Sequence, residues 1–381
     1  MKLGLAQQIG RDAASWTRDL VDAGAFQNEK TRLRQVWTLV GLTTELPRDG
    51  DWIARDLWGH SVFVQRFGDQ LKGFENRCAH RFYPLRHGDK GNGPIRCGFH
   101  GWQYDQEGAA IGIPMCKEFF GCTPKQMNAQ LQKLEIATCG TLIFGRFPGE
   151  HSTGSLTDYL GDMEPIMRFM SAEAVSPGRI DRNVAANWKL AYHITLEDYH
   201  IVAVHPSTFG ANGHLRSDEY RYYRSGLHSA MLNGEDRAEE SLKAMSTACA
   251  ASRYEAEGYR IFHIFPNLVV LHIRFFDRWY VLVMQYLADA IDRTIVRSWY
   301  FPANFATKSS AIRRLSDRTL DIPRALAMRY GIHKIVGEDN AICEGLQRVA
   351  HQANRLPFLA TEEERIAWFD EAYARIMSSN A

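Results

Sequence analysis

The sequence predicts an α+β protein with two domains, a small antiparallel β domain followed by a larger domain in which helices cover an antiparallel sheet. Three observations support this fold class. The chain has 381 residues, which is more than one domain usually contains. Its first part holds short apolar runs cut by Gly, Pro, Asn and Asp, the pattern of a turn-rich sheet. Its later part holds long β-type runs followed by helical segments.

The elements are expected in the following order. Residues 1–33 alternate charged and apolar positions at helical spacing and predict one or two helices. The runs VWTLV, SVFVQRF and GTLIFGRF predict strands of the β domain. The later runs YRIFHIF, LVVLHIRFF, RWYVLVMQYL and RTIVRSWYF predict neighbouring antiparallel strands of a half-buried sheet. Helices are expected over about 303–330, 338–353 and 361–377.

The resulting domain division has three parts. Residues 1–35 are expected to form N-terminal helices that pack on the larger domain. Residues 36–148 are expected to form the β domain, and residues 149–381 the larger domain. No internal repeat or low-complexity segment interrupts this order in the sequence.

The composition is that of an ordinary globular protein. Hydrophobic residues make up 45% and charged residues 23% of the chain, so disorder is not expected. The net charge of +1 gives no electrostatic reason to expect binding to nucleic acid or to a membrane surface. The N-terminal segment lacks the apolar run of a signal peptide, and no later stretch resembles a transmembrane helix. We therefore expect a soluble cytoplasmic protein whose seven cysteines are metal ligands or free thiols.

The β domain contains the pattern C-x-H-x16-C-x2-H, formed by Cys78, His80, Cys97 and His100. Two thiolates and two imidazoles from two tight loops can hold a [2Fe–2S] cluster, with the cysteines on one iron and the histidines on the other. Zinc accepts the same donors. Zinc fingers, however, group their cysteines in one pair and their histidines in another, whereas here each loop supplies one of each. The pattern therefore favours the cluster over zinc.

The run NRCAHRFYPLRHGDKGNGPIRCGFHGWQYD closely resembles the Rieske signature of the α subunits of aromatic-ring-hydroxylating oxygenases. The shared positions include Arg81, Pro84 and Leu85 after the first pair and the HGW that begins at His100. The resemblance extends from the β domain to the C-terminal helices. It implies a Rieske [2Fe–2S] domain over 36–148 and a helix-grip-like catalytic domain that holds a mononuclear non-heme iron.

Such an iron needs two histidines and one carboxylate, and the resemblance points to His200 and His205 as the histidines. Their spacing places them about 140° apart on an ideal helix, so both reach one metal only if the helix ends or bulges between them. Pro206 disfavours the helical conformation at His205 and predicts a helix end there. On spacing alone, the two histidines would more often be a packed or surface pair.

Asp339 is expected to be the third ligand. The segment VGEDNAICEGLQRV places Glu338 and Asp339 at the start of a helix, with Ile342, Cys343 and Leu346 at i+3, i+4 and i+7 from Asp339. By this pattern Asp339 faces the buried side and Glu338 does not. A carboxylate that stabilises the helix N-terminus would explain the spacing equally well. The resemblance of this segment to the third-ligand segment of the family favours Asp339 as a ligand.

The resemblance also implies an acid that links an iron-ligating histidine to a cluster histidine of a neighbouring subunit. On a helix, Glu197 lies about 60° from His200 and Asp198 about 160°, so Glu197 is predicted to be this acid. Most ring-hydroxylating dioxygenases have Asp at this place, and Glu resembles the carnitine and choline-type monooxygenases. His193 stands where the family usually has Asn. It could be a third histidine ligand, a hydrogen-bond donor near the iron or a packed core residue.

The resemblance implies a terminal oxygenase. Electrons from NAD(P)H would come through a flavin or iron–sulfur reductase, with or without a ferredoxin, and pass between subunits of a head-to-tail homotrimer. With O2 as cosubstrate, the iron would hydroxylate a small organic substrate, expected to be aromatic, as in aromatic hydrocarbon catabolism. Oxidation of an N-methyl or quaternary ammonium compound is the alternative within this class. A Rieske protein that only transfers electrons is the alternative from another class, and would hold about two irons per chain instead of about three.

Overall fold

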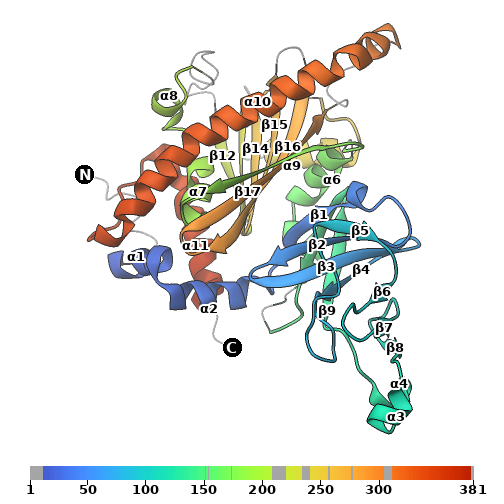
Figure 1. Ribbon diagram of the computed structural model, residues 1–381. Coiled ribbons are helices and arrows are strands. Elements are labelled where there is room, and N and C mark those ends of the chain that lie inside the picture. Colours follow the sequence, from blue (N-terminus) through green and yellow to red (C-terminus); the bar gives the residue numbers. More distant parts are fainter. Residues whose placement is uncertain are drawn as a thin grey trace. The chain divides into compact units, whose positions relative to one another are not determined.

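The computed structural model describes residues 12–150, 152, 154–172, 174–207, 220–233, 241–255, 258–275, 278–303 and 311–378 (Figure 1). Side chains are described for these residues except 233, 311–322 and 325. The chain divides into two compact units. Residues 31–156 form the smaller unit, whereas residues 1–30 and 157–380 form the larger one. The larger unit is therefore discontinuous in the chain.

A seven-stranded antiparallel sheet forms the framework of the smaller unit, within its described residues. The strand order is β1-β10-β9-β4-β3-β2-β5. The three apolar runs expected to be strands here fall on β1, β3 and β10, so this part of the prediction is confirmed. The strands are β1 (Thr38–Leu42), β2 (Asp51–Leu57), β3 (His60–Phe67), β4 (Gln70–Glu75), β5 (Lys90–Asn92), β9 (Lys133–Cys139) and β10 (Leu142–Arg146).

A second, three-stranded sheet of the same unit supports the metal-binding pattern. It consists of β6 (Ile95–Arg96), β7 (Gln103–Tyr104) and β8 (Ala110–Gly112). The first Cys-His pair lies between β4 and β5, and the second lies in the tight loop between β6 and β7. Two short helices follow, α3 (Cys116–Phe120) and α4 (Pro124–Met127). The strands thus hold two loops at which thiols and imidazoles can meet.

The larger unit contains another seven-stranded antiparallel sheet among its described residues, in the order β11-β17-β16-β15-β14-β13-β12. The four long β-type runs fall on β14 to β17, which pair as sequential neighbours as expected. The strands are β11 (Gly178–Val184), β12 (Tyr220–Ser225), β13 (His228–Asn233), β14 (Arg260–Ile264), β15 (Leu268–Phe275), β16 (Arg278–Ala290) and β17 (Arg293–Pro302).

Helices accompany this sheet, and α10 is by far the longest of them (Figure 1). In the described residues they are α1 (Ala13–Val21), α2 (Ala23–Leu33), α5 (Leu156–Leu160), α6 (Met163–Ser171), α7 (Trp188–His193), α8 (Ile201–Val204), α9 (Ser241–Ala250), α10 (Ala311–Val349) and α11 (Glu364–Ser378). A 3-10 turn, η3 (Ile194–Leu196), follows α7 directly. Within the described ranges, none of the helices combines the length and the apolar character needed to cross a membrane.

The expected break between helices 303–330 and 338–353 is wrong, because α10 runs through it without interruption. Gly331 and Gly337 lie at the expected break, and both allow a close approach instead of ending the helix. A Cβ atom at Gly331 would lie 3.3 Å from the ring of Phe275, and one at Gly337 would lie 3.4 Å from Nη2 of Arg182. These glycines therefore serve helix–sheet packing.

Three helices of the larger unit meet at the buried carboxylate of Glu29 in α2. It accepts hydrogen bonds from Nε1 of Trp188 at 2.5 Å and from the hydroxyl group of Tyr373 at 2.6 Å. It also accepts one from Nζ of Lys189. Because all these side chains are buried, the network fixes α7 against α2 and α11. The segment that follows α7 carries the second metal-binding pattern.

Candidate metal centres

The loop that carries Cys78 and His80 is held by the buried side chain of Asn76. Oδ1 of Asn76 accepts a hydrogen bond from the backbone N–H of Arg86 at 2.7 Å, and its Nδ2 donates to the carbonyl group of Arg86 at 2.9 Å. Within the loop, the backbone N–H of Cys78 donates to the carbonyl group of Tyr83 at 2.9 Å. A long irregular loop thereby keeps a defined conformation.

The second loop is a tight turn that carries Cys97 and His100. The backbone N–H of Cys97 donates to the carbonyl group of Trp102 at 2.8 Å, and the N–H of Gly101 donates to that of Cys97 at 3.0 Å. Gly101 has a φ of +74°, a left-handed conformation that a residue with a side chain rarely adopts. The turn therefore requires glycine after His100.

The two loops bring the four side chains of the pattern together. Cys78 and Cys97 are buried, with 1% and 2% of their surface exposed. The rings of His80 and His100 lie with their centroids 4.7 Å apart, and they are half-buried and exposed respectively. The thiols thus lie inside the unit, and His100 reaches its surface. This arrangement suits a cluster whose histidine-bound iron faces a partner protein.

The side chains also fit the cluster by their chemistry. Burial, with a contribution from the neighbouring Cys97 thiol, raises the pKa of the Cys78 thiol. Two buried thiolates would therefore need a metal to compensate their charge. Burial lowers the pKa of His80 and keeps its ring neutral, as a metal ligand requires. Its Nδ1 is buried and has no hydrogen-bond partner among the described residues, so a donor atom is available there.

Tyr104 is a neighbour of the thiols that the sequence pattern did not reveal. Its hydroxyl oxygen lies 3.0 Å from Sγ of Cys78 and accepts a hydrogen bond from the backbone N–H of Ala79, also at 3.0 Å. Burial raises the pKa of Tyr104, so the hydroxyl group keeps its proton and can donate it to the sulfur. The tyrosine in the run HGWQYD was the only available signal.

The second candidate centre lies in the larger unit, on the chain that leaves α7 and η3. Glu197 has an extended backbone (φ −138°, ψ 159°), and α8 then forms a single turn between His200 and His205. His205 is not helical (φ −113°, ψ 42°), which confirms the helix end predicted from Pro206. The helical geometry used to compare Glu197 and Asp198 with His200 is wrong, because the 3-10 turn η3 ends at Leu196 and Glu197 is extended.

Here His200 and His205 flank α8, and Asp339 approaches from α10. Their ligand atoms all lie within 4.8 Å of one another, and this is the one group of three or more residues found among the described residues that could hold a single metal ion. Nε2 of His205 is 2.8 Å and Nε2 of His200 is 3.6 Å from Oδ1 of Asp339. The three side chains that the sequence grouped are therefore adjacent.

Each imidazole is also held on its outer side by a carboxylate. Nδ1 of His200 contacts Oε1 of Glu197, and Nδ1 of His205 lies 2.7 Å from Oε2 of Glu338. Oε2 of Glu197 accepts the backbone N–H of His200 at 3.0 Å. Carboxylates at Nδ1 favour the tautomer in which Nε2 carries a lone pair toward the centre.

The charges of this site suit a cation. Burial opposes protonation of His200, but the nearby carboxylates of Asp339 and Glu197 outweigh burial and raise its pKa to about 9. Burial likewise opposes ionisation of Asp339, but the two histidines lower its pKa. Oδ1 of Asp339 is close to both histidines, yet it has no partner with hydrogen-bond geometry among the described residues. A metal ion between these atoms would supply the missing interaction.

The environment of Asp339 differs from the expected one. Asp339 lies well inside α10, so it does not stabilise a helix N-terminus. Of the expected apolar stripe, Cys343 is buried, but Ile342 and Leu346 are 41% and 48% exposed. Glu338, which the pattern placed away from the site, contacts His205 because adjacent positions on a helix are only about 100° apart.

His193 and Asp198 contact other partners. Nε2 of His193 lies 3.4 Å from Oδ1 of Asp370, and its ring packs edge-on against Phe369. His193 is not in the group of potential ligands found among the described residues, and its contacts are those of a packed residue. Oδ2 of Asp198 lies 2.7 Å from Nη2 of Arg365.

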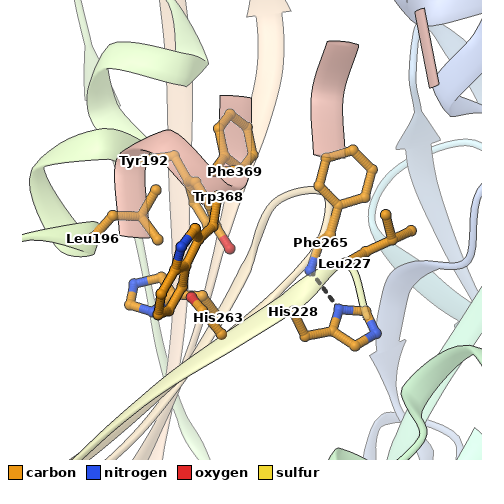
Figure 2. Close-up of a pocket in the computed structure, with 9 residues that line it drawn as sticks. Tyr192, Leu196, Leu227, His228, His263, Phe265, Trp368 and Phe369 are labelled. Atoms are coloured by element: carbon orange, nitrogen blue, oxygen red, sulfur yellow. Dashed lines mark hydrogen bonds between the residues drawn. The ribbon is translucent and has the colours of Figure 1, made fainter. Parts of the chain in front are cut away.

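A small cavity borders the segment that leads to Glu197 (Figure 2). Tyr192 and Leu196 come from this segment, and Phe265 and Phe369 add aromatic surface. Burial lowers the pKa of both histidines in its wall, so these rings are neutral. The wall is therefore aromatic and uncharged. The nine lining residues are Tyr192, Leu196, Leu227, His228, Ser229, His263, Phe265, Trp368 and Phe369.

Two family models match the chain. Residues 36–134 match the model described as the Rieske [2Fe-2S] domain. Residues 169–379, more than half of the 381 residues, match the model described as the ring hydroxylating alpha subunit (catalytic domain). The first match contains the two Cys-His loops, and the second contains His200, His205 and Asp339.

Curated relatives match over part of their length. The large oxygenase component of the naphthalene 1,2-dioxygenase system of Ralstonia sp. is 32% identical over 198 residues, which is 49% of this chain and 43% of that protein. The α subunit of the N,N-dimethyl phenylurea N-demethylase of Sphingobium sp. (strain YBL2) is 28% identical over 223 residues, which is 56% of this chain and 46% of that protein. The matches thus span less than half the length of these relatives.

A solved structure resembles the whole chain. The crystal structure of naphthalene 1,2-dioxygenase from Rhodococcus sp. bound to indole has a TM-score of 0.74, with 17% sequence identity, and covers 99% of both chains. At this identity the similarity concerns the fold. The expected α+β fold class, a small antiparallel β domain and a larger domain of helices and an antiparallel sheet, is confirmed.

Proposed function

Because this chain belongs to the family of ring-hydroxylating α subunits and contains a Rieske [2Fe–2S] domain, we propose that it is a terminal oxygenase that hydroxylates a small organic substrate with O2. The observation that carries the proposal is the second centre, where His200, His205 and Asp339 adjoin one another in the larger unit. A protein that only transfers electrons would have no use for this centre. The electron-transfer alternative is therefore disfavoured.

The proposed ligand sets follow from the two centres. Cys78, His80, Cys97 and His100 would hold the cluster, and His200, His205 and Asp339 would hold the iron. When bound, the cluster supplies electrons one at a time and the iron activates O2. The buried thiols, the unpartnered Nδ1 of His80 and the unpartnered oxygen of Asp339 support this assignment.

Glu197 is the proposed acid of the electron path. Its carboxylate holds Nδ1 of His200, so its hydrogen bonds reach the centre directly. The turn that contains it lies at the surface of the larger unit, since Tyr199 is 73% and Val202 is 72% exposed. A second chain could therefore bring a cluster histidine to Glu197, and we propose that the electron crosses between subunits there.

The proposed assembly is a head-to-tail homotrimer that receives electrons from NAD(P)H through a flavin or iron–sulfur reductase, with or without a ferredoxin. His100 and the neighbouring Phe99 and Phe82 are exposed at the cluster loops and offer an apolar docking surface. The proposed domains are the N-terminal helices over 1–35, the Rieske domain over 36–148 and the catalytic domain over 149–381. A cytoplasmic location is also proposed, because all seven cysteines are free thiols, as in reducing compartments.

The proposed substrate is an aromatic compound, the class expected from the sequence. The name of the Ralstonia relative agrees with this class. The alternative is an N-methyl or quaternary ammonium compound. It is supported by Glu197 in place of the usual Asp and by the name of the N-demethylase relative.

Metal counting and coupled turnover test the proposal. We expect about three irons per chain, two with the spectrum of a Rieske cluster and one mononuclear. With a reductase and NADH, a panel of benzoates, phenols, indoles and trimethylammonium compounds should reveal O2 uptake linked to a hydroxylated or demethylated product. Two irons per chain and no product with any compound would contradict the proposal.

The Glu197→Gln variant tests the electron path. It should keep both metals and a reducible cluster but form product at least about tenfold more slowly. Asp181→Asn, in an ion pair on β11 of the same unit, is the control and should behave as the native protein. Fast turnover of Glu197→Gln would show that the electron takes another path.

A further inference from the structure

The neighbouring acids Glu197 and Asp198 contact different partners. Glu197 is extended, and successive side chains in an extended segment point to opposite sides. Glu197 accordingly bonds to His200. Oδ2 of Asp198 accepts from Nη2 of Arg365 at 2.7 Å and from the hydroxyl group of Tyr222 at 3.2 Å. One acid therefore belongs to the metal centre and the other to a separate contact behind it.

The contact of Asp198 is a buried ion pair. The side chain of Arg365 is fully buried, and that of Asp198 is 14% exposed. The guanidinium carbon of Arg365 lies 4.6 Å from the ring centroid of Tyr222. Nε and Nη1 of Arg365 have no hydrogen-bond partner among the described residues. Within these residues, Asp198 is the one carboxylate found in an ion pair with Arg365. A buried charge with a single counter-charge is strongly held to it.

This ion pair and the bond from Tyr222 connect the turn of residues 197–200 to one helix and one strand. Arg365 belongs to α11 and Tyr222 to β12. Among the described residues, the side-chain bonds of Glu197 reach His200 alone, so they close the turn without attaching Glu197 to another element. His200 approaches Asp339 of α10 at one end of the turn. Next to Glu197, Asp198 attaches the turn to α11 and β12, and Asp198 therefore determines where the turn places the carboxylate of Glu197.

We propose that Asp198, held by Arg365 and Tyr222, is a positioning residue that aligns Glu197 with Nδ1 of His200. This inference rests on the proposed function, since it concerns the acid of the electron path. Asp198 itself does not contact His200 or His205 in the described structure. Its role is to keep the turn in the one place where Glu197 can serve the metal centre.

Asp198→Asn tests the proposal, because it retains the size of the side chain and removes its charge. In a single turnover of the reduced holoenzyme with O2 and substrate, cluster reoxidation should become about tenfold slower, while the iron content stays native. Tyr222→Phe keeps the ion pair and should have a smaller effect. Asp181→Asn, which weakens the ion pair with Arg297 on the same unit, should leave the rate unchanged.

A spectroscopic measurement separates positioning from general stability. With Co2+ in place of the mononuclear iron, the absorption bands of Asp198→Asn should shift, because the orientation of His200 changes. The double variant Asp198→Asn/Arg365→Met should be no slower than the slower single variant, since both residues act through one contact.

The proposal is overturned if Asp198→Asn lowers the melting temperature but keeps the Co2+ spectrum and a reoxidation rate within twofold of the native protein. In that case, Asp198 only stabilises the fold. Arg365→Lys gives a second test if Asp198→Asn does not fold. If the native protein itself shows no transfer from cluster to iron, the proposed function fails, whereas the Co2+ spectra still test the position of the turn.

Discussion

The hydroxyl group of Tyr104 is placed to tune the cluster site. It accepts the backbone N–H of Ala79, so its own proton is directed at Sγ of Cys78. Hydrogen bonds to cluster sulfurs stabilise the reduced, more negative state. Tyr104→Phe should therefore lower the reduction potential. A loss of about 1 kcal/mol corresponds to about 40 mV for a one-electron couple.

A redox titration of the Rieske signal measures this shift. Tyr83→Phe is the matched control, because Tyr83 lies in the first loop and its ring contacts that of Phe99 at a tilt. Its potential should remain native. An unchanged potential in Tyr104→Phe would mean that the hydroxyl proton does not reach the sulfur.

Glu338 is expected to contribute to metal affinity although it is not a proposed ligand. Its Oε2 lies 2.7 Å from Nδ1 of His205 and fixes that ring. Glu338→Ala should weaken ferrous iron binding about 10- to 100-fold, and Glu338→Gln should weaken it less, since Gln can still accept the bond. Equilibrium titration of the iron-free site measures the affinity, with the cluster absorption as an internal standard.

Glu371→Gln is the control for this prediction. Glu371 pairs with Arg224 at the surface of the same unit, and its replacement should not affect iron binding. Native affinity in Glu338→Ala would contradict a role of Glu338 at the centre.

The family resemblance, and not spacing alone, grouped His200, His205 and Asp339, and the structure brings their ligand atoms together. The neighbours of these residues were harder to predict. Glu338 was missed because a helical wheel gives only the direction of each side chain. It does not show that His205 can contact Asp339 through one ring nitrogen and the adjacent Glu338 through the other. Glu197 was chosen by helical geometry and does contact His200, but through an extended residue that closes a turn.

At the scale of elements, His228 of β13 connects this strand to α5 and to the segment between β14 and β15. Its Nε2–H donates to the carbonyl group of Tyr159 at 2.7 Å. Figure 2 shows the second bond, in which Nδ1 accepts the backbone N–H of Phe265 at 3.1 Å. The bond from Phe265 requires the neutral ring, because a protonated Nδ1 cannot accept a hydrogen bond. Burial accordingly lowers the pKa of His228 to about 4.

This pKa predicts a pH dependence of stability. Unfolded histidine has a pKa near 6.5, so between about pH 6.5 and 4 the unfolded chain binds a proton that folded His228 does not. The free energy of unfolding should therefore fall as the pH drops through 6.5, and His228 should account for about 2 kcal/mol of the loss at pH 5. Denaturant unfolding at pH 7.5 and pH 5 measures the loss.

His228→Gln isolates the contribution of this residue. The variant keeps a neutral polar side chain without a proton that titrates in this range, so its loss between the two pH values should be about 2 kcal/mol smaller. An equal loss in both proteins would assign the pH dependence to other groups.

The strands were easier to predict than the helices. Runs such as LVVLHIRFF are rich in β-branched and aromatic residues and lie between turn residues, and they became β15 and its neighbours. The length of α10 could not be predicted from residue types in the same way. Gly331 and Gly337 resemble a helix end in sequence, and only the packing against Phe275 and Arg182 explains them.

At the scale of the whole molecule, the proposed trimer predicts that defective chains complement one another. Cys78→Ser should lose the cluster, and Glu197→Gln should lose the electron path at its iron. When the two variants are co-expressed, a mixed contact can pair the intact cluster of one chain with the intact Glu197 of the other. Activity should then return to a measurable fraction of the native value.

The same mixture excludes the opposite geometry. If electrons passed from cluster to iron within one chain, neither variant would have a complete path and no mixture would be active. Each variant alone is the baseline, and purification through two different affinity tags ensures that both chains are present in the measured assembly.

The discontinuity of the larger unit determines the order in which its parts can form during synthesis. Glu29 meets its partner Tyr373 across 344 residues, and the ribosome needs about 20–70 s for that stretch. The smaller unit, residues 31–156, is complete much earlier. It can thus mature and take up its cluster on the nascent chain, while the helix that carries Glu29 waits for the last helix to emerge.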